Sequence, residues 1–150
     1  KKKYAIAIGE QTAENIKITV GCASPLKEEL TTQVRGRDLV TGLPKEITIT
    51  SEEVRKAITR SIRSIVLALK NTIEETPPEL IADLLNRNIY LAGGGSLLRG
   101  LEELISQETR LPVKVVEDPL TVVVRGCGLV LEDIDSLKGV LMPTSKESYT

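Results

Sequence analysis

The chain of 150 residues is 41% hydrophobic and carries 20 basic and 21 acidic side chains, for a formal net charge of −1; this composition suits one ordinary domain or two small lobes around a hydrophobic core. A nucleic-acid-binding protein normally has a basic excess and often stacks aromatic side chains on bases, so a chain with three tyrosines and no Phe or Trp argues against that class. The absence of histidine removes the commonest general base and zinc ligand.

The first fifty residues predict a small α+β lobe. Thr12 has the side chain of a helix N-cap, and the short amphipathic helix that follows would end at Gly21. The same segment also alternates in a way that suits a strand. Alternation over residues 30–35 and 46–50, with turn residues between them, predicts a β-hairpin.

Two helices follow, each with a recognisable start. Thr50 and Glu53 have the spacing of a capping box, and apolar residues at intervals of three and four predict an amphipathic helix of about six turns. Thr76 repeats the pattern as the expected cap of a second helix, with proline at its first position.

From residue 89 onward strands and helices alternate. Short apolar strands are predicted at 89–92 and 112–116, with a helix over 97–105 between them. Residues 118–119 would cap a last helix that ends near Ile134. This order predicts parallel strands joined by crossover helices, and therefore an α/β lobe.

Cys22 and Cys127 lie far apart and lack the spacing of a metal site. No signal peptide or run of roughly 18 apolar residues is visible, which predicts reduced thiols in a cytoplasmic protein. Residues 136–150 are polar enough to be loosely held.

Residues 93–95 are three successive glycines between a predicted strand and helix. Glycine allows left-handed backbone angles and lets a ligand touch the main chain, and the N-terminus of the next helix would favour an anion. Leu98 breaks the dinucleotide-binding fingerprint, and residues 101–102 do not complete a P-loop. A close-packed turn without a ligand is the alternative.

Residues 89–100, Ile-Tyr-Leu-Ala-Gly-Gly-Gly-Ser-Leu-Leu-Arg-Gly, resemble the adenosine motif of the actin, sugar-kinase and heat-shock ATPase superfamily, and more particularly of its MreB branch of bacterial actin-like, cell shape-determining proteins. Segments 8–18, 36–44, 76–80 and 117–121 resemble MreB in the same order and at similar separations. The chain therefore resembles the C-terminal portion of an MreB-type protein over nearly its whole length.

The resemblance implies a partial actin-like ATPase (ribonuclease H-like) fold. Residues 1–50 would form the small α+β lobe, similar to subdomain IIB, and residues 51–150 an α/β lobe, similar to part of subdomain IIA. It also implies an ATP-dependent, filament-forming protein that organises cell-wall synthesis and rod shape. Its expected partners are further copies of itself and transmembrane cell-shape proteins. We expect it in the cytoplasm, with membrane association in the full-length protein through parts outside this chain.

The implied ligand is ATP or ADP, held between two walls. A carboxylate can accept from ribose hydroxyls and a lysine stem can cover a purine, whereas the alternative for such a pair is an exposed i,i+3 contact on a helix. By resemblance, the wall that would contact the adenosine and the neighbouring phosphate consists of Gly93, Gly94, Gly95, Ser96 and Leu97. The wall that would contact the base and ribose from the other lobe consists of Glu14, Asn15, Ile16 and Lys17.

No catalytic or metal-binding residue is assigned in this chain. In the superfamily, the phosphate hairpins and the carboxylates that hold Mg²⁺ and water come from segments before the ones matched here, so we expect the chain alone neither to hydrolyse ATP nor to bind a membrane. Its sheet would also expose an edge. Two alternatives stay open: a sugar kinase or chaperone-type ATPase of the same superfamily, or a non-catalytic interaction module.

Overall fold

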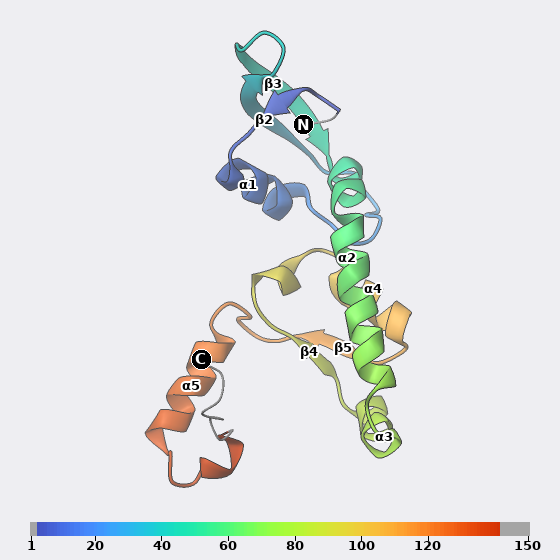
Figure 1. Ribbon diagram of the computed structural model, residues 1–150, viewed down its shortest axis with the longest axis vertical. Coiled ribbons are helices and arrows are strands. Elements are labelled where there is room, and N and C mark those ends of the chain that lie inside the picture. The colour runs from blue at the N-terminus through green and yellow to red at the C-terminus, as the bar shows by residue number, and fades with distance from the viewer. Residues whose placement is uncertain (1–2, 142–150) are drawn as a thin grey trace, which may run out of the picture.

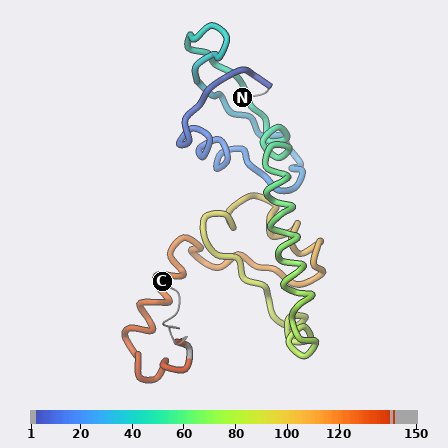
Figure 2. The backbone as a smooth tube through the Cα atoms, in the orientation of Figure 1, coloured from blue at the N-terminus to red at the C-terminus, as the bar shows by residue number. Residues whose placement is uncertain are grey.

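The structure is a computed structural model that describes residues 3–141, and the molecule is elongated (Figures 1 and 2). An antiparallel sheet with helix α1 (Glu10–Val20) lies toward one end of the longest axis. A parallel sheet with helix α4 (Leu101–Thr109) lies beyond it. Helix α2 (Ser51–Glu74) runs from the first part into the second and connects them.

The antiparallel sheet contains β1 (Ile6–Ala7), β2 (Thr31–Asp38) and β3 (Pro44–Thr50), in that order. Strands β2 and β3 form a hairpin with Thr31 opposite Thr50. The predicted hairpin is confirmed, and its strands extend further toward the turn than the alternation of apolar residues indicated.

Helix α1 covers this sheet and buries an apolar face against it. Ile16, Val20 and Val34 form a buried cluster, with Val54 at the start of α2 packed against its edge. The helix interpretation of this segment is therefore confirmed over the strand alternative, because the buried residues follow the helical interval of four.

The predicted cap of α1 is wrong, and its predicted end is right. The helix begins at Glu10 with Gly9 at the N-cap, and Ala13 N–H donates to the Gly9 carbonyl, so Thr12 lies inside the first turn. Gly21 ends the helix and donates its N–H to the Lys17 carbonyl at 2.9 Å. A Cβ at residue 21 would overlap that carbonyl oxygen, which explains why glycine is required there.

The start of α2 is a capping box, as predicted. Glu53 N–H donates to Thr50 Oγ1 at 3.3 Å, and Thr50 N–H donates to Glu53 Oε2 at 3.1 Å. The same carboxylate accepts hydrogen bonds from Lys3 Nζ and Tyr4 Oη, which tie the N-terminal segment to the helix. These bonds, that of Lys3 first, lower the pKa of Glu53 to about 2.

Helix α3 (Pro78–Asn86) follows, but Thr76 does not cap it. The Thr76 hydroxyl donates to the Thr72 carbonyl of the preceding helix at 2.6 Å, and Pro77 occupies the N-cap. Threonine hydroxyls compete for nearby carbonyls in this way, so the spacing alone did not decide the cap.

The second part contains β4 (Ile89–Leu91) and β5 (Val113–Val115), which pair in parallel and are joined by α4. The predicted strand–helix–strand crossover is confirmed. Its core combines the buried side chains of α2, α4 and β5, which are Ile62, Val66, Leu101, Ile105 and Val113.

The predicted helix over 97–105 is wrong in its first turn. A separate 3-10 helix η1 (Gly94–Leu97) follows β4, and α4 begins only after Gly100, whose φ is +74°. Ala23 N–H donates to the Arg99 carbonyl at 2.7 Å. Because residues 99–100 pair with this neighbouring segment, the chain cannot continue as one helix there.

Helix α5 (Val122–Glu132) ends close to the predicted Ile134, but the predicted cap at 118–119 is wrong. Thr121 occupies the N-cap, and the Asp118 carbonyl accepts from the N–H groups of Thr121 and Val122. A short 3-10 helix η2 (Lys138–Val140) follows. The predicted polar tail falls largely on residues 142–150, which lie outside the described residues.

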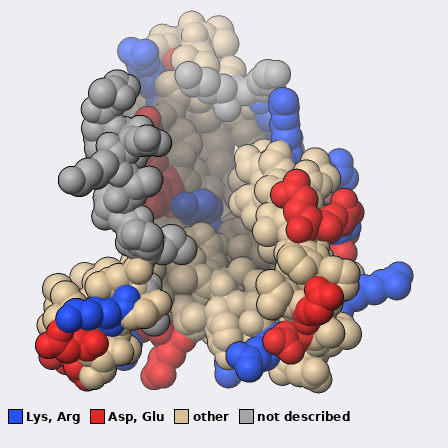
Figure 3. All heavy atoms as spheres, turned by 60° about the horizontal axis from the view of Figure 1, so that its bottom comes forward, with Lys and Arg blue, Asp and Glu red and all other residues tan. Residues whose placement is uncertain are grey.

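The described surface carries charges of both signs. Figure 3 shows Lys and Arg in small groups among Asp and Glu, in keeping with the near-zero net charge of the sequence. Cys22 and Cys127 are free thiols, the first buried and the second exposed. The division of the chain at residue 50 stays a prediction.

Candidate functional site

The glycine segment is a tight turn at the end of β4. Gly93 has a φ of +81°, which favours glycine, and its N–H donates to the Pro119 carbonyl at 2.7 Å. The Gly93 carbonyl accepts from both the N–H and the hydroxyl of Ser96, at 3.1 and 2.7 Å. Ser96 is buried, so its hydroxyl stabilises the turn from inside.

The other two glycines differ in their surroundings. A Cβ at Gly94 would lie 3.2 Å from Leu120 Cδ2, so this residue packs against the segment before α5. A Cβ at Gly95 would have nothing within 4 Å. The backbone at Gly95 is therefore open to a ligand, and the side chain of Leu97, 57% exposed, offers an apolar contact close by.

The second predicted wall lies on α1. Glu14 and Lys17 are exposed, with Lys17 Nζ 3.9 Å from Glu14 Oε1, and the Asn15 side-chain oxygen accepts from Gln11 Nε2 at 3.4 Å. The Ile16 side chain points into the core and is only 8% exposed. Glu14, Asn15 and Lys17 can thus reach a ligand with their side chains, whereas Ile16 holds the helix in place.

Arg99 connects the two walls, and the sequence did not single it out. Its Nη1 donates to the Ile18 carbonyl at 2.9 Å and to the Gly21 carbonyl at 3.3 Å. Hydrogen bonds between α1 and the glycine segment therefore pass through Arg99 and not through the predicted site residues. No local pattern indicated this contact, because its partners lie 81 and 78 positions away.

The N-terminus of α4 does not adjoin the glycines, contrary to the expectation of an anion-favouring helix start beside them. Residues 96–100 intervene, and Glu102 and Glu103 occupy the first turn of α4. Glu102 Oε2 accepts from the Val115 N–H at 3.2 Å, which ties α4 to β5. The open groups near a ligand are thus those of η1, not those of α4.

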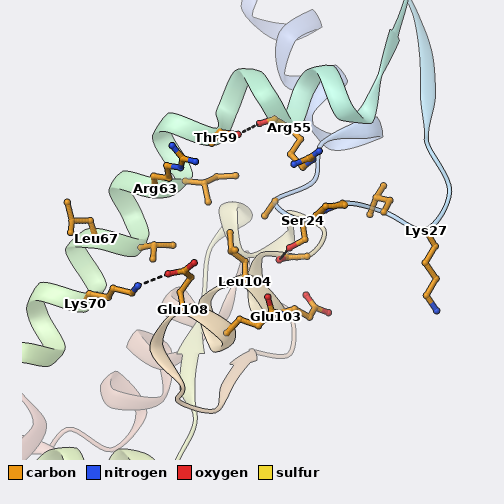
Figure 4. A pocket seen from close by; sticks show the side chains of 17 residues that line it. Ser24, Lys27, Arg55, Thr59, Arg63, Leu67, Lys70, Glu103, Leu104 and Glu108 are labelled. Atoms are coloured by element: carbon orange, nitrogen blue, oxygen red, sulfur yellow. Dashed lines mark hydrogen bonds and ion pairs between the residues drawn. The ribbon is translucent and has the colours of Figure 1, made fainter.

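A separate groove of 990 Å³ lies between α2, α4 and residues 23–27 (Figure 4). Arg55, Arg63 and Lys70 line the α2 side, and Lys70 bonds to Glu108 across the groove. None of the nine predicted nucleotide-binding residues lines it. The groove is therefore distinct from the two walls described above.

Two further properties concern residues 3–141 only. They contain no cluster of three or more His, Cys, Asp or Glu side chains that could hold a metal ion. Among their helices, none combines the length and apolar character needed to cross a membrane.

Comparison with known sequences gives a match to the MreB/Mbl protein family over residues 1–139. The cell shape-determining protein Mbl of Bacillus cereus is 46% identical over 137 residues, which are 91% of this chain and 41% of that protein. The cell shape-determining protein MreB of Escherichia coli is 45% identical over 141 residues, or 94% of this chain and 41% of that protein. The chain thus spans about two fifths of the length of these relatives.

Comparison with solved structures agrees. MreB5 of Spiroplasma citri, in a crystal structure bound to ADP, superposes with a TM-score of 0.86 at 35% identity, covering 92% of this chain and 42% of that one. A MamK double helical filament superposes with a TM-score of 0.72 at 24% identity, covering 88% and 40%. The second likeness concerns the fold alone.

Proposed function

Because the chain belongs to the MreB/Mbl family of actin-like cell shape-determining proteins, we propose that it holds the adenosine end of ATP or ADP in an ATP-dependent bacterial actin. Its fold is part of the actin-like α/β fold, as the resemblance implied. Family membership sets aside the sugar-kinase and chaperone alternatives. The interaction module without a ligand remains the competing function.

The observation that carries the proposal is the open backbone at Gly95, in a turn that also contains Gly93 and Gly94. Gly93 has a positive φ that favours glycine, and Gly94 packs against Leu120. Nothing in the described chain occupies the space beside Gly95. The main chain at Gly95 is therefore accessible, and a nucleotide could approach it there without meeting a side chain.

Side chains of the two predicted walls suit a nucleoside. Leu97 offers an apolar surface for the purine, and Glu14 offers carboxylate oxygens for ribose hydroxyls. The Lys17 stem can cover the base while its ammonium group remains in water. The similarity to MreB5, whose crystal structure holds ADP, supports this choice of ligand.

The chain supplies little for the phosphates. Its described residues offer no cluster of three or more His, Cys, Asp or Glu side chains. On the family resemblance, we assign Mg²⁺ and the hydrolytic step to other parts of the full-length protein. This chain then contributes affinity for the nucleoside and not the chemistry of hydrolysis.

We further propose that the chain takes part in head-to-tail self-association. The β2–β3 loop projects from one end of the long axis and exposes Leu39, Val40 and Leu43, while α3 at the other end exposes Leu80 and Leu85 (Figure 1). Apolar patches of this kind mark interaction surfaces. Two different patches at opposite ends produce an open filament when copies join end to end.

The turn that carries the first patch is held in shape. Asp38 Oδ1 accepts from the N–H groups of Val40 and Thr41 at 2.7 and 3.2 Å, and Asp38 Oδ2 lies 3.0 Å from Lys45 Nζ. The Val40 N–H bond and then the Lys45 bond lower the pKa of Asp38. A fixed turn loses less conformational entropy on binding, which suits a filament contact.

The cellular role is proposed on family grounds. Filaments of the full-length protein would organise cell-wall synthesis and rod shape from the cytoplasm, with transmembrane cell-shape proteins as partners. Membrane association would come through segments that these residues do not include.

Binding of ADP to the full-length protein tests the central proposal. Isothermal titration calorimetry should show one saturable site, and sedimentation should show polymer that forms with ATP. If the full-length protein binds neither ADP nor ATP, the interaction module becomes the better interpretation.

A further inference from the structure

Arg99 lies two residues beyond the glycine wall and makes contacts with both its side chain and its main chain. Its Nη1 reaches the carbonyl oxygens of Ile18 and Gly21, and its own carbonyl accepts from Ala23 N–H at 2.7 Å. Cys22 and Arg99 also form a parallel β-bridge. One residue thus joins the end of α1 to the end of the nucleotide segment.

These contacts satisfy a physical need of α1. The last four carbonyls of an α-helix have no partner within the helix. The Ile18 carbonyl is one of them, and a guanidinium group there also interacts favourably with the negative end of the helix dipole. Arg99 therefore caps α1 from a distant part of the sequence.

The connection extends on both sides of Arg99, along a seam where residues 21–24 contact residues 98–100. A Cβ at Gly21 would lie 3.2 Å from Leu98 Cδ1, and Ser24 Oγ donates to the Gly100 carbonyl at 2.9 Å. Besides these non-covalent contacts, α2 joins the part with the antiparallel sheet to the part with the parallel sheet through the chain itself. The seam, with Arg99 at its centre, therefore acts together with the packing of α2 in both cores to set how α1 faces the glycine turn.

Building on the proposed nucleotide function, we propose that Arg99 is a positioning residue. It sets the separation of the α1 wall, with Glu14 and Lys17, from the Gly93–Gly95 turn before the nucleotide binds. A ligand that must touch both walls binds more tightly when they are already in place, because it does not have to order them.

The test uses the full-length protein with nitroxide labels at Gln11→Cys on α1 and Gln107→Cys on α4, both exposed positions. Accessible cysteines, including the exposed Cys127, are replaced by serine. Cys22 can stay, because burial shields it and raises the pKa of its thiol. Dipolar spectroscopy then reports the distance between α1, which carries one wall, and α4, which follows the other wall in the chain, and calorimetry reports ADP affinity.

Arg99→Met removes both side-chain hydrogen bonds and keeps the aliphatic stem. We expect a broader distance distribution without nucleotide, narrowing when ADP is added, and an ADP Kd raised roughly fivefold or more. Arg60→Met, at an exposed position on α2, is the matched control and should change neither quantity.

Unchanged distances in Arg99→Met overturn the proposal, even if affinity falls, because Arg99 would then act on the nucleotide itself. If Arg99→Met does not fold, Arg99→Gln is the second variant: it removes the charge and is too short to reach both carbonyls, and unchanged distances in that variant overturn the proposal equally. Absence of ADP binding by the parent protein contradicts the proposed function instead, while the distances without nucleotide still test the role of Arg99.

Discussion

The Nη1 atom of Arg99 lies 2.9 Å from the carbonyl oxygen of Ile18, so a side chain from the end of the glycine segment caps the helix that carries the opposite wall. The two candidate nucleotide-binding segments, more than 70 residues apart in sequence, are thereby parts of one arrangement. Glu14 and Lys17 keep their side chains exposed in that arrangement, and Gly95 keeps an open backbone.

Gly95→Val should weaken ADP binding without weakening the fold. The new side chain meets no protein atom near its Cβ, but it fills the space where we place the nucleotide. We expect the ADP Kd to rise by about tenfold or more, equivalent to roughly 1.4 kcal/mol, with an unchanged melting temperature. Gly139→Val, in the other 3-10 helix and equally open, is the control. Equal ADP affinity in Gly95→Val and the parent protein would remove Gly95 from the site.

Gly94→Leu should reduce both binding and stability. Its Cβ would lie 3.2 Å from Leu120 Cδ2, so a larger side chain displaces the segment before α5. Overpacking of this kind costs about 1–3 kcal/mol. Urea unfolding and calorimetry on the same sample measure the two effects. A stable Gly94→Leu protein that binds ADP normally would contradict both the packing and the site assignment.

Glu53→Gln should lower the free energy of unfolding at neutral pH, and that free energy should depend less on pH than in the parent protein. The folded-state pKa of Glu53 is lowered from its usual 4.5 to about 2, so the stabilisation is present above pH 4.5 and is lost as the pH falls toward 2. We expect a loss of about 1 kcal/mol at pH 7, the usual scale for a helix cap, and a smaller difference from the parent protein near pH 3. Glu79→Gln, in the first turn of α3, is the control. If the free energies of unfolding of Glu53→Gln and the parent protein differ by the same amount at every pH, the cap contributes no pH dependence.

Val40→Asp and Leu85→Glu should each raise the critical concentration for ATP-dependent polymer in sedimentation. Each places a charge in one of the two apolar end patches, and an unpaired charge is costly to bury in a contact. ADP affinity should not change, since the β2–β3 loop and α3, which carry these residues, lie away from the segment between β4 and α4 (Figure 1). Ile65→Asp, also exposed but in the middle of α2, should polymerise normally. Normal polymer from both end variants would exclude these patches as contacts.

The features that sequence predicted well are those decided by neighbouring residues. The capping box at Thr50 and Glu53 needs only a spacing of three, and the parallel strands follow from the order of elements. The remaining helix starts were wrong because other contacts decided them. Thr76 found a carbonyl in the preceding helix, and the backbone at Arg99 found a partner in Ala23 that ended the expected helix early.

The candidate site also combines features that the sequence predicted with features that only the structure shows. Sequence identified the glycines and the helix pair through resemblance to a family. The structure adds that Gly93 has a positive φ, that a Cβ at Gly94 would meet Leu120, and that a Cβ at Gly95 would meet nothing. Arg99 could not be found from local pattern, because a cap supplied from 81 residues away leaves no periodic signal.

Helix α2 has a mechanical consequence. Its first turn is anchored in one core by the capping box and Val54, and its middle in the other by Ile62 and Val66, with no loop in between. Its 24 residues form a rod of about 36 Å. The two parts therefore cannot pivot on a flexible joint, and any tilt between them must bend or twist this rod. A change in that tilt would also move α3, which follows the end of this rod and where the next copy is proposed to attach.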